Sequence, residues 1–150
     1  MKLVHHITLS VFSKEHEDHA KLADALAKLV PFNITEQKIE LEKQIAIGFN
    51  ESKIRIFKIL LKTQRHTNSF LNFLKESLTK DQKKVLLVQI DSRLDPENVF
   101  FIRFDKSNWL NNQELTLVDG GNCFHVKMSI ATFPSSREKA KEVVKNLFHI

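Results

Sequence analysis

The sequence predicts an α+β fold, with a mixed, mostly antiparallel sheet and helices packed on one of its faces. Several segments alternate apolar and polar residues with the two-residue period of a half-buried strand. Other segments place apolar residues three and four positions apart, as an amphipathic helix does. Strands with one polar face are typical of a sheet that helices cover on one side only. The predicted element order is β-α-β-β-α-α-β-β-β-α.

Length and composition indicate one folded domain, which we expect to span residues 1–150. The chain is 42% hydrophobic and 27% charged, which is enough apolar material for a sizeable core. Its one cysteine, Cys123, excludes an internal disulfide and a cysteine-rich zinc site. No apolar run approaches the roughly 20 residues that span a bilayer. The N-terminus lacks a signal-peptide pattern, so we expect a cytoplasmic protein without a membrane partner.

The first strand and helix are predicted before residue 31. Residues 3–12 alternate, with isoleucine, leucine and valine on one face and polar residues with Phe12 on the other. An amphipathic helix over about 16–30 follows. Ser13 is the candidate cap of this helix, and Pro31 ends it.

Two strands are predicted next. Residues 36–43 alternate weakly, which favours a short strand, whereas residues 52–62 form a stronger strand rich in isoleucine. Gly48 and Asn50 lie between them, as a connecting loop requires.

Two helices are predicted in the middle of the chain. Apolar residues between 70 and 78 have helical spacing. Thr79 and Gln82 have the spacing of a capping box, which predicts the start of the second helix. Asp95 and Pro96 then break the helical pattern.

The remaining elements are three strands and a final helix. Residues 99–105 predict a strand, followed by a short helix or turn around Trp109. Residues 114–118 and 123–132 predict a hairpin, because the glycine-containing turn between them permits positive φ angles. The last helix is expected to begin with a capping box made by Ser135 and Glu138.

The positive charge is concentrated in one part of the chain. The net charge is +5, and residues 51–90 carry 9 basic and 3 acidic side chains. A concentrated basic excess favours polyanions as partners, with nucleic acid first and an acidic membrane surface second. The alternative is a merely basic soluble protein.

The exposed sheet face is the predicted RNA-binding surface. Cations beside aromatic residues on such a face suit phosphate contact and base stacking. Lys58, Lys62 and Arg65 stand at the end of one strand and the start of a helix, where they could seat a phosphate. The full set of predicted RNA contacts comprises Lys53, Arg55, Lys58, Lys62, Arg65, Arg103, Lys106 and Lys127.

Signs of catalysis are weak, so we expect no catalytic residue, no metal and no cofactor. The sequence has neither a phosphate-binding glycine loop nor a nucleophile elbow. A metal-dependent nuclease that uses Asp105 stays open as an alternative, but it needs a second carboxylate that the sequence does not place nearby. Trp109 either packs in the core or stacks on a base, and burial is favoured.

One part of the chain resembles a known family. The strand ending Arg103-Phe104-Asp105-Lys106, the following Trp109-Leu110, the segment 115–120 and the strand 124–130 resemble a small archaeal family of RNA-binding proteins and predicted exosome subunits. The resemblance implies an α+β fold akin to double-stranded-RNA-binding domains, or to the ribosomal protein that holds 5S rRNA. It also implies RNA as partner, no catalysis, and roles for Arg103 and Lys106.

The leading hypothesis is a non-catalytic protein that binds structured or double-stranded RNA. It would act as an accessory factor of the archaeal exosome or of ribosomal RNA processing. The alternative is a protein-interaction module or homodimeric scaffold without direct RNA contact. Exposure of Phe57 and Phe101 in one strand register would favour that alternative.

Overall fold

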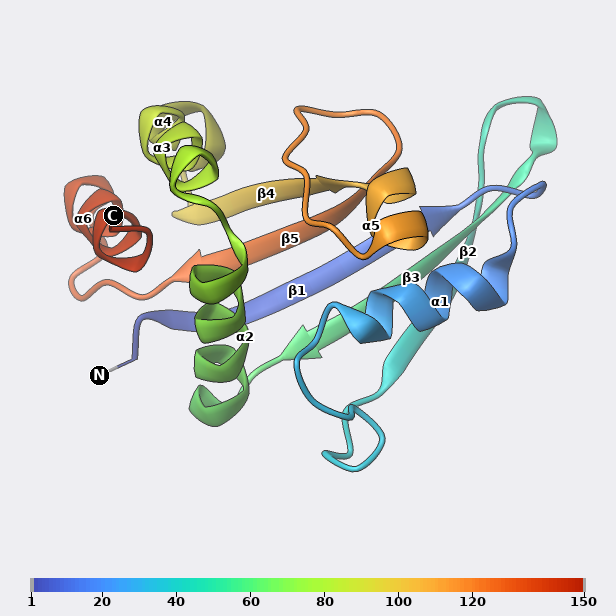
Figure 1. Cartoon of the computed structure of the whole chain (residues 1–150), viewed down its shortest axis with the longest axis horizontal. Helices are drawn as coiled ribbons and strands as arrows, with labels where there is room; N and C mark the ends of the chain where they lie inside the picture. The colour runs from blue at the N-terminus through green and yellow to red at the C-terminus, as the bar shows by residue number, and fades with distance from the viewer. Residues whose placement is uncertain (1, 150) are drawn as a thin grey trace. The chain divides into compact units, whose positions relative to one another are not determined.

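Five antiparallel strands form one sheet in the order β2-β3-β1-β5-β4 (Figure 1). The structure is a computed structural model that describes residues 2–149. The strands are β1 (Val4–Ser13), β2 (Leu41–Ile47), β3 (Lys53–Leu61), β4 (Val99–Asp105) and β5 (Cys123–Ile130). This order makes β2 and β4 the two edge strands, while β1 lies at the centre.

The helices complete the predicted α+β class, which is confirmed. They are α1 (His19–Lys28), α2 (Gln64–Ser77), α3 (Lys80–Val88), α4 (Ile90–Arg93), α5 (Lys106–Asn112) and α6 (Arg137–Leu147), with a short 3-10 turn η1 (Phe49–Glu51). Among the described residues, no helix has the length and apolarity that a membrane span requires.

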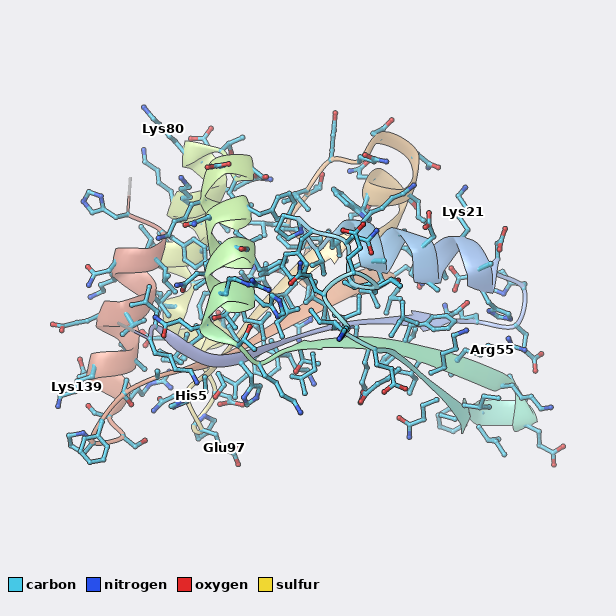
Figure 2. The ribbon with its side chains drawn as sticks, turned by 90° about the horizontal axis from the view of Figure 1, so that it is seen from below. His5, Lys21, Arg55, Lys80, Glu97 and Lys139 are labelled. Atoms are coloured by element: carbon cyan, nitrogen blue, oxygen red, sulfur yellow. The ribbon has the colours of Figure 1, made fainter. Side chains whose placement is uncertain are left out.

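The chain divides into two compact units. Unit 1 comprises the residues up to Ile7, Leu61–Ile102, and the residues from Lys127 onward. Unit 2 comprises Thr8–Leu60 and Arg103–Val126. In unit 1, α2 and α3 lie on one side of its strand segments, and in unit 2, α1 and α5 do the same (Figure 2).

Alternation along the strands decides which side chains are buried. Alternate β1 residues Ile7, Leu9 and Val11 are fully buried, whereas Phe12, on the opposite face, is exposed. Along β4, every second residue is likewise buried, beginning with Phe100. The predicted phase of both strands is therefore confirmed, although Ser10, on the face of β1 that carries Phe12, is buried.

Side-chain caps explain where the helices begin. Thr79 and Gln82 form the predicted capping box at the start of α3, which is confirmed. Asp18 caps α1, so the prediction of Ser13 as a cap is wrong. Ser13 is instead the buried last residue of β1. Ser136 caps α6 by accepting a hydrogen bond from the Lys139 backbone, so the capping box predicted at Ser135 is also wrong.

The second strand lies further along the chain than the sequence predicts. Residues 34–38 form turns, with the Asn33 side chain accepting a hydrogen bond from the Glu36 backbone. β2 begins only at Leu41, opposite Ile59 of β3. The prediction of 36–43 was wrong because a local hydrogen-bonded turn outweighs the weak alternation there. The connecting loop carries Asn50 in the left-handed region, with φ of 59°.

The predicted hairpin between 114–118 and 123–132 is wrong in its first half. Residues 114–118 form a single bridge, between Leu117 and Phe104, rather than a strand. The Thr116 carbonyl accepts from the Asp105 backbone, and the Val118 backbone donates to the Arg103 carbonyl. Because α5 begins directly after β4 ends, this pairing cannot extend further. The sheet therefore has five strands rather than the six predicted.

The Thr79 cap gives a test of this local account of helix formation. We expect Thr79→Ala to lower the free energy of unfolding by about 1 kcal/mol, because one backbone donor of α3 loses its partner. Chemical denaturation measures the change. Ser77→Ala, which removes an exposed hydroxyl that makes no hydrogen bond within residues 2–149, is the matched control and should change little. Equal effects of the two substitutions would contradict the capping role.

Candidate nucleic-acid interface

The positive charge of the protein belongs to unit 1. Unit 1 contains 13 lysine and arginine residues against 7 aspartate and glutamate residues, whereas unit 2 contains 10 against 11. Unit 1 therefore has a net charge of +6 and unit 2 a net charge of −1, which together give the +5 of the chain. Long-range attraction of a polyanion is expected to act mainly on this unit.

The cations of unit 1 occupy several surfaces. Lys62 and Arg65 are exposed at the start of α2. Figure 2 shows Lys80 at one end of the helical layer and Lys139 on the side of α6. Lys62 and Arg65, two members of the predicted phosphate seat, therefore belong to the same unit. Lys58, the third member of the predicted phosphate seat, belongs to unit 2.

Some cations of unit 1 are neutralised by the protein itself. Asp91 accepts Lys141 at 2.6 Å and lies 3.7 Å from Arg137. The hydrogen bond and charge of Lys141, with the charge of Arg137, lower the pKa of Asp91. Arg137 also donates to the backbone carbonyls of Leu94 and Asp95. Part of the α6 charge is therefore committed to structure rather than to a ligand.

The sheet face of unit 1 offers a cation beside an aromatic ring. Lys127 of β5 is exposed, and its Nζ lies 5.7 Å from the ring centroid of Phe101 on β4. This distance is within the range of a cation–π contact, which holds the ammonium over the ring. The sequence prediction that placed Lys127 on an uncovered sheet face is consistent with this geometry.

The sheet face of unit 2 carries an aromatic pair, in which Phe12 is exposed and His125 is half-buried. The open face of unit 2 is defined as Thr8, Phe12, Lys58, Arg103 and His125, which alternate with the buried residues of their strands. Phe12 is 47% exposed, and its ring centroid lies 5.5 Å from that of His125, with the planes tilted by 43°. An exposed aromatic ring on a sheet face that also carries an arginine provides a surface on which a nucleobase can stack.

The single cysteine supports this face and remains a thiol. Cys123 is buried, and its Sγ lies 3.7 Å from Nε2 of His125. Burial raises the pKa of Cys123, while the nearby charges of Arg103 and Lys106 oppose that shift. A thiol with a raised pKa is a poor nucleophile. Cys123 therefore packs beside His125 on the same strand.

Lys53 and Arg55 lie on the opposite face from the one predicted. They alternate in phase with the buried residues Phe57, Ile59 and Leu61, which face the helices. The prediction was wrong because both faces of β3 are apolar in the sequence, so the pattern leaves the phase undetermined. The same phase buries Phe57, so the joint exposure of Phe57 and Phe101 that would favour an interaction module is not found.

Lys106 is a structural residue. It is 5% exposed, and its Nζ donates to the Phe12 carbonyl at 2.8 Å and to both carboxylate oxygens of Glu17. Burial acts against the charged carboxylate, but the hydrogen bonds from Lys14 and Lys106 outweigh it and lower the pKa of Glu17. The prediction that Lys106 contacts RNA is therefore wrong, because its ammonium is enclosed by the protein.

Trp109 is buried, as the sequence favoured. Its Nε1 donates to the Ala25 carbonyl at 2.9 Å, which ties α5 to α1. Asp105 caps α5 by accepting a hydrogen bond from the Asn108 backbone. The described residues contain no group of three or more His, Cys, Asp and Glu side chains that could hold a metal ion.

Comparison with known proteins identifies the family. The fold and the two sheet faces define a small α+β protein with cationic and aromatic groups on uncovered strands. A family described as RNA binding matches residues 6–131, so the chain belongs to that family. The RNA-binding protein PAB1135 of Pyrococcus abyssi is 28% identical over 141 residues, which cover 94% of this chain and 91% of that protein.

Solved structures share the fold. The crystal structure of protein AF2318 from Archaeglobus fulgidus has a TM-score of 0.85 at 28% identity, covering 96% of this chain and 99% of that one. The structure of Mth689, a DUF54 protein from Methanothermobacter thermautotrophicus, has a TM-score of 0.78 at 22% identity, covering 98% and 99% of the two chains. The second likeness concerns the fold alone.

Removal of the Lys106 ammonium tests its structural role. We expect Lys106→Met to lower the free energy of unfolding by about 3–5 kcal/mol, because Glu17 keeps its charge in a largely enclosed position without its partner. In the wild type, the lowered pKa of Glu17 contributes stability at neutral pH that is lost as the pH falls through the folded-state value. The free energy of unfolding of the variant should therefore fall less on acidification than that of the wild type. Chemical denaturation at several pH values measures both.

The matched control for that experiment is Lys14→Met. Lys14 is exposed and forms no side-chain ion pair within residues 2–149. Its substitution should change the free energy of unfolding by less than about 0.5 kcal/mol. A loss in Lys106→Met no larger than in this control would contradict the structural role of the buried ammonium.

Proposed function

We propose that the chain binds structured or double-stranded RNA without catalysing a reaction, and that the open face of unit 2 makes the base contacts. The contact between the exposed ring of Phe12 and the half-buried ring of His125 is the observation that carries the proposal. Arg103 lies on the same face and supplies a cation for the phosphate backbone. Stacking of a base on an aromatic side chain contributes about 1–3 kcal/mol.

Unit 1 contributes the electrostatic attraction in this proposal. Lys62, Arg65 and Lys127 are exposed there and contact phosphates, while the remaining positive charge draws RNA toward the protein. Lys58 of unit 2 is half-buried and stands opposite Glu42 across the β2–β3 ladder, so its contribution is smaller. Phosphate contacts of this kind position the RNA without reading its sequence.

The family resemblance extends the proposal to a cellular role. The Arg103-Phe104-Asp105-Lys106 strand end resembles a family of predicted exosome subunits, so we propose that the protein serves as an accessory factor of the archaeal exosome or of ribosomal RNA processing. Crosslinking in native cell extract, followed by sequencing of the attached RNA and mass spectrometry of co-purified proteins, tests this role. Absence of exosome subunits and ribosomal RNA precursors would contradict it.

RNA affinity of two single variants tests the binding face. We expect Phe12→Ala to weaken binding of a hairpin RNA by roughly 5- to 150-fold, the equivalent of one lost stacking contact. Arg103→Gln should lower the slope of log affinity against log salt by about one, because one phosphate contact is lost. Fluorescence anisotropy at several salt concentrations measures both effects.

The control for the charge variant is Lys21→Gln. Lys21 projects from the side of α1 that faces away from the strands of unit 2 (Figure 2). Its neutralisation changes net charge by the same amount as Arg103→Gln but should leave the salt slope unchanged. Equal slopes for the two variants would show that charge alone, rather than the open face of unit 2, governs binding.

A second candidate function is self-association through the edge strand β2. Ile47 and Phe49 are 74% and 96% exposed, and β2 has a strand neighbour on one side only. Exposed apolar residues on a free strand edge favour pairing with another strand. Paired β2 strands of two copies would give a homodimeric scaffold.

Mass measured by light scattering tests this second candidate. If two β2 strands pair, the wild-type chain has the mass of a dimer. Ile47→Lys then has the mass of a monomer, because it introduces a buried ammonium into the paired edge. Val88→Lys, which introduces the same charge at an exposed valine of α3, is the control and should leave the mass unchanged. A monomeric wild-type chain at about 100 µM, where a Kd of 1 µM still gives mostly dimer, would contradict self-association.

A further inference from the structure

A groove in unit 2 lies outside the surfaces described so far. It has a volume of about 350 Å³ and lies between α1 and the β2–β3 pair, on the helix side of the strands. This volume is at the lower end of the roughly 300–1,000 Å³ of sites that hold small molecules. Small side chains on α1, Ala20 and Ala23, leave the space open.

The strand register explains why apolar and basic residues meet there. Lys43 of β2 pairs with Phe57 of β3, and Ile45 pairs with Arg55. Residues directly opposite each other in an antiparallel ladder project from the same face. All four line the groove, so Phe57 and Ile45 each have a cation beside them. Arg55 lies on the part of β3 that runs beneath α1 (Figure 2).

The groove has unneutralised positive charge. Its lining includes Lys43, Arg55 and His19 but no acidic side chain. Within residues 2–149, the side chains of Lys43 and Arg55 form no hydrogen bond or ion pair. His19 is held in place by a hydrogen bond between its Nδ1 and the hydroxyl of Ser13, which is fully buried. An anionic group with an apolar body complements this arrangement.

We propose that the groove receives one unpaired nucleotide of the bound RNA. The phosphate lies at Arg55 and Lys43, since a guanidinium forms paired hydrogen bonds with phosphate oxygens. The base and sugar lie against Ala20, Ala23 and Ile45. This inference rests on the proposed RNA-binding function. The cationic lining without a carboxylate favours a nucleotide over an apolar protein segment.

A single-stranded extension can reach the groove from the open face of unit 2. Four strand spacings separate β4 from β2, which amounts to about 19 Å at about 4.8 Å per spacing. Eight stacked nucleotides span about 27 Å at about 3.4 Å each. β2 is an edge strand, so an RNA strand can pass around it to the helix side.

The test compares two hairpin RNAs that share one stem. One ends bluntly, and the other carries an eight-nucleotide single-stranded 3′ tail. We expect the wild-type chain to bind the tailed hairpin about 10-fold more tightly than the blunt one. In Ala20→Leu, the added side chain fills the groove, so the two hairpins should bind equally while blunt-hairpin affinity is unchanged. Arg55→Gln should reduce the tail advantage without any added bulk.

Ala27→Leu is the matched control. It adds the same bulk to the same helix outside this groove, and it should retain the tail advantage. Failure of the wild-type chain to bind either hairpin would overturn the proposed function, and the groove inference with it. Binding of the blunt hairpin with no tail advantage would overturn the groove inference alone. An undiminished tail advantage in Ala20→Leu would also overturn it and leave the groove to an apolar protein segment.

Discussion

The two-residue alternation of the strands is the constraint on which the remaining structure depends. In unit 2, the buried residues Leu9 and Val11 fix the phase of β1, and this phase places Phe12 on the uncovered side. A slip of β1 by one residue would exchange its two faces and turn Phe12 toward the helices. The buried ammonium of Lys106 reinforces this arrangement, because it binds the Phe12 carbonyl and ties α5 to the end of β1.

The sequence predicted elements well where several local signals agreed. β4 matches the predicted range 99–105 because its alternation is strict, and α3 begins at a complete capping box. β2 was misplaced because its apolar residues Ile45 and Ile47 are exposed and therefore do not report a buried face. Burial of a strand, rather than its conformation, generates the pattern that a sequence reveals.

The placement of the predicted contact residues also depends on how clearly their strand alternates. Arg103 and Lys127 follow strands of clear phase and lie where the sequence indicated. Lys53 and Arg55 belong to a strand that is apolar on both faces, so their side could not be deduced. Lys106 was unpredictable for a different reason, since its partner Glu17 is 89 residues away and only the fold brings them together.

The two units have different roles in RNA binding, because one carries the positive charge and the other carries the aromatic rings. Unit 1 holds the positive excess, which attracts RNA at long range. The open face of unit 2 holds the ring pair that makes close contact with bases. Ultraviolet crosslinking of the wild-type chain to a bound hairpin RNA, with mass spectrometry of the attached peptides, tests this division most directly. The account predicts crosslinks on the peptides that contain Phe12 and His125, whereas crosslinks confined to α3 and α6 would contradict it.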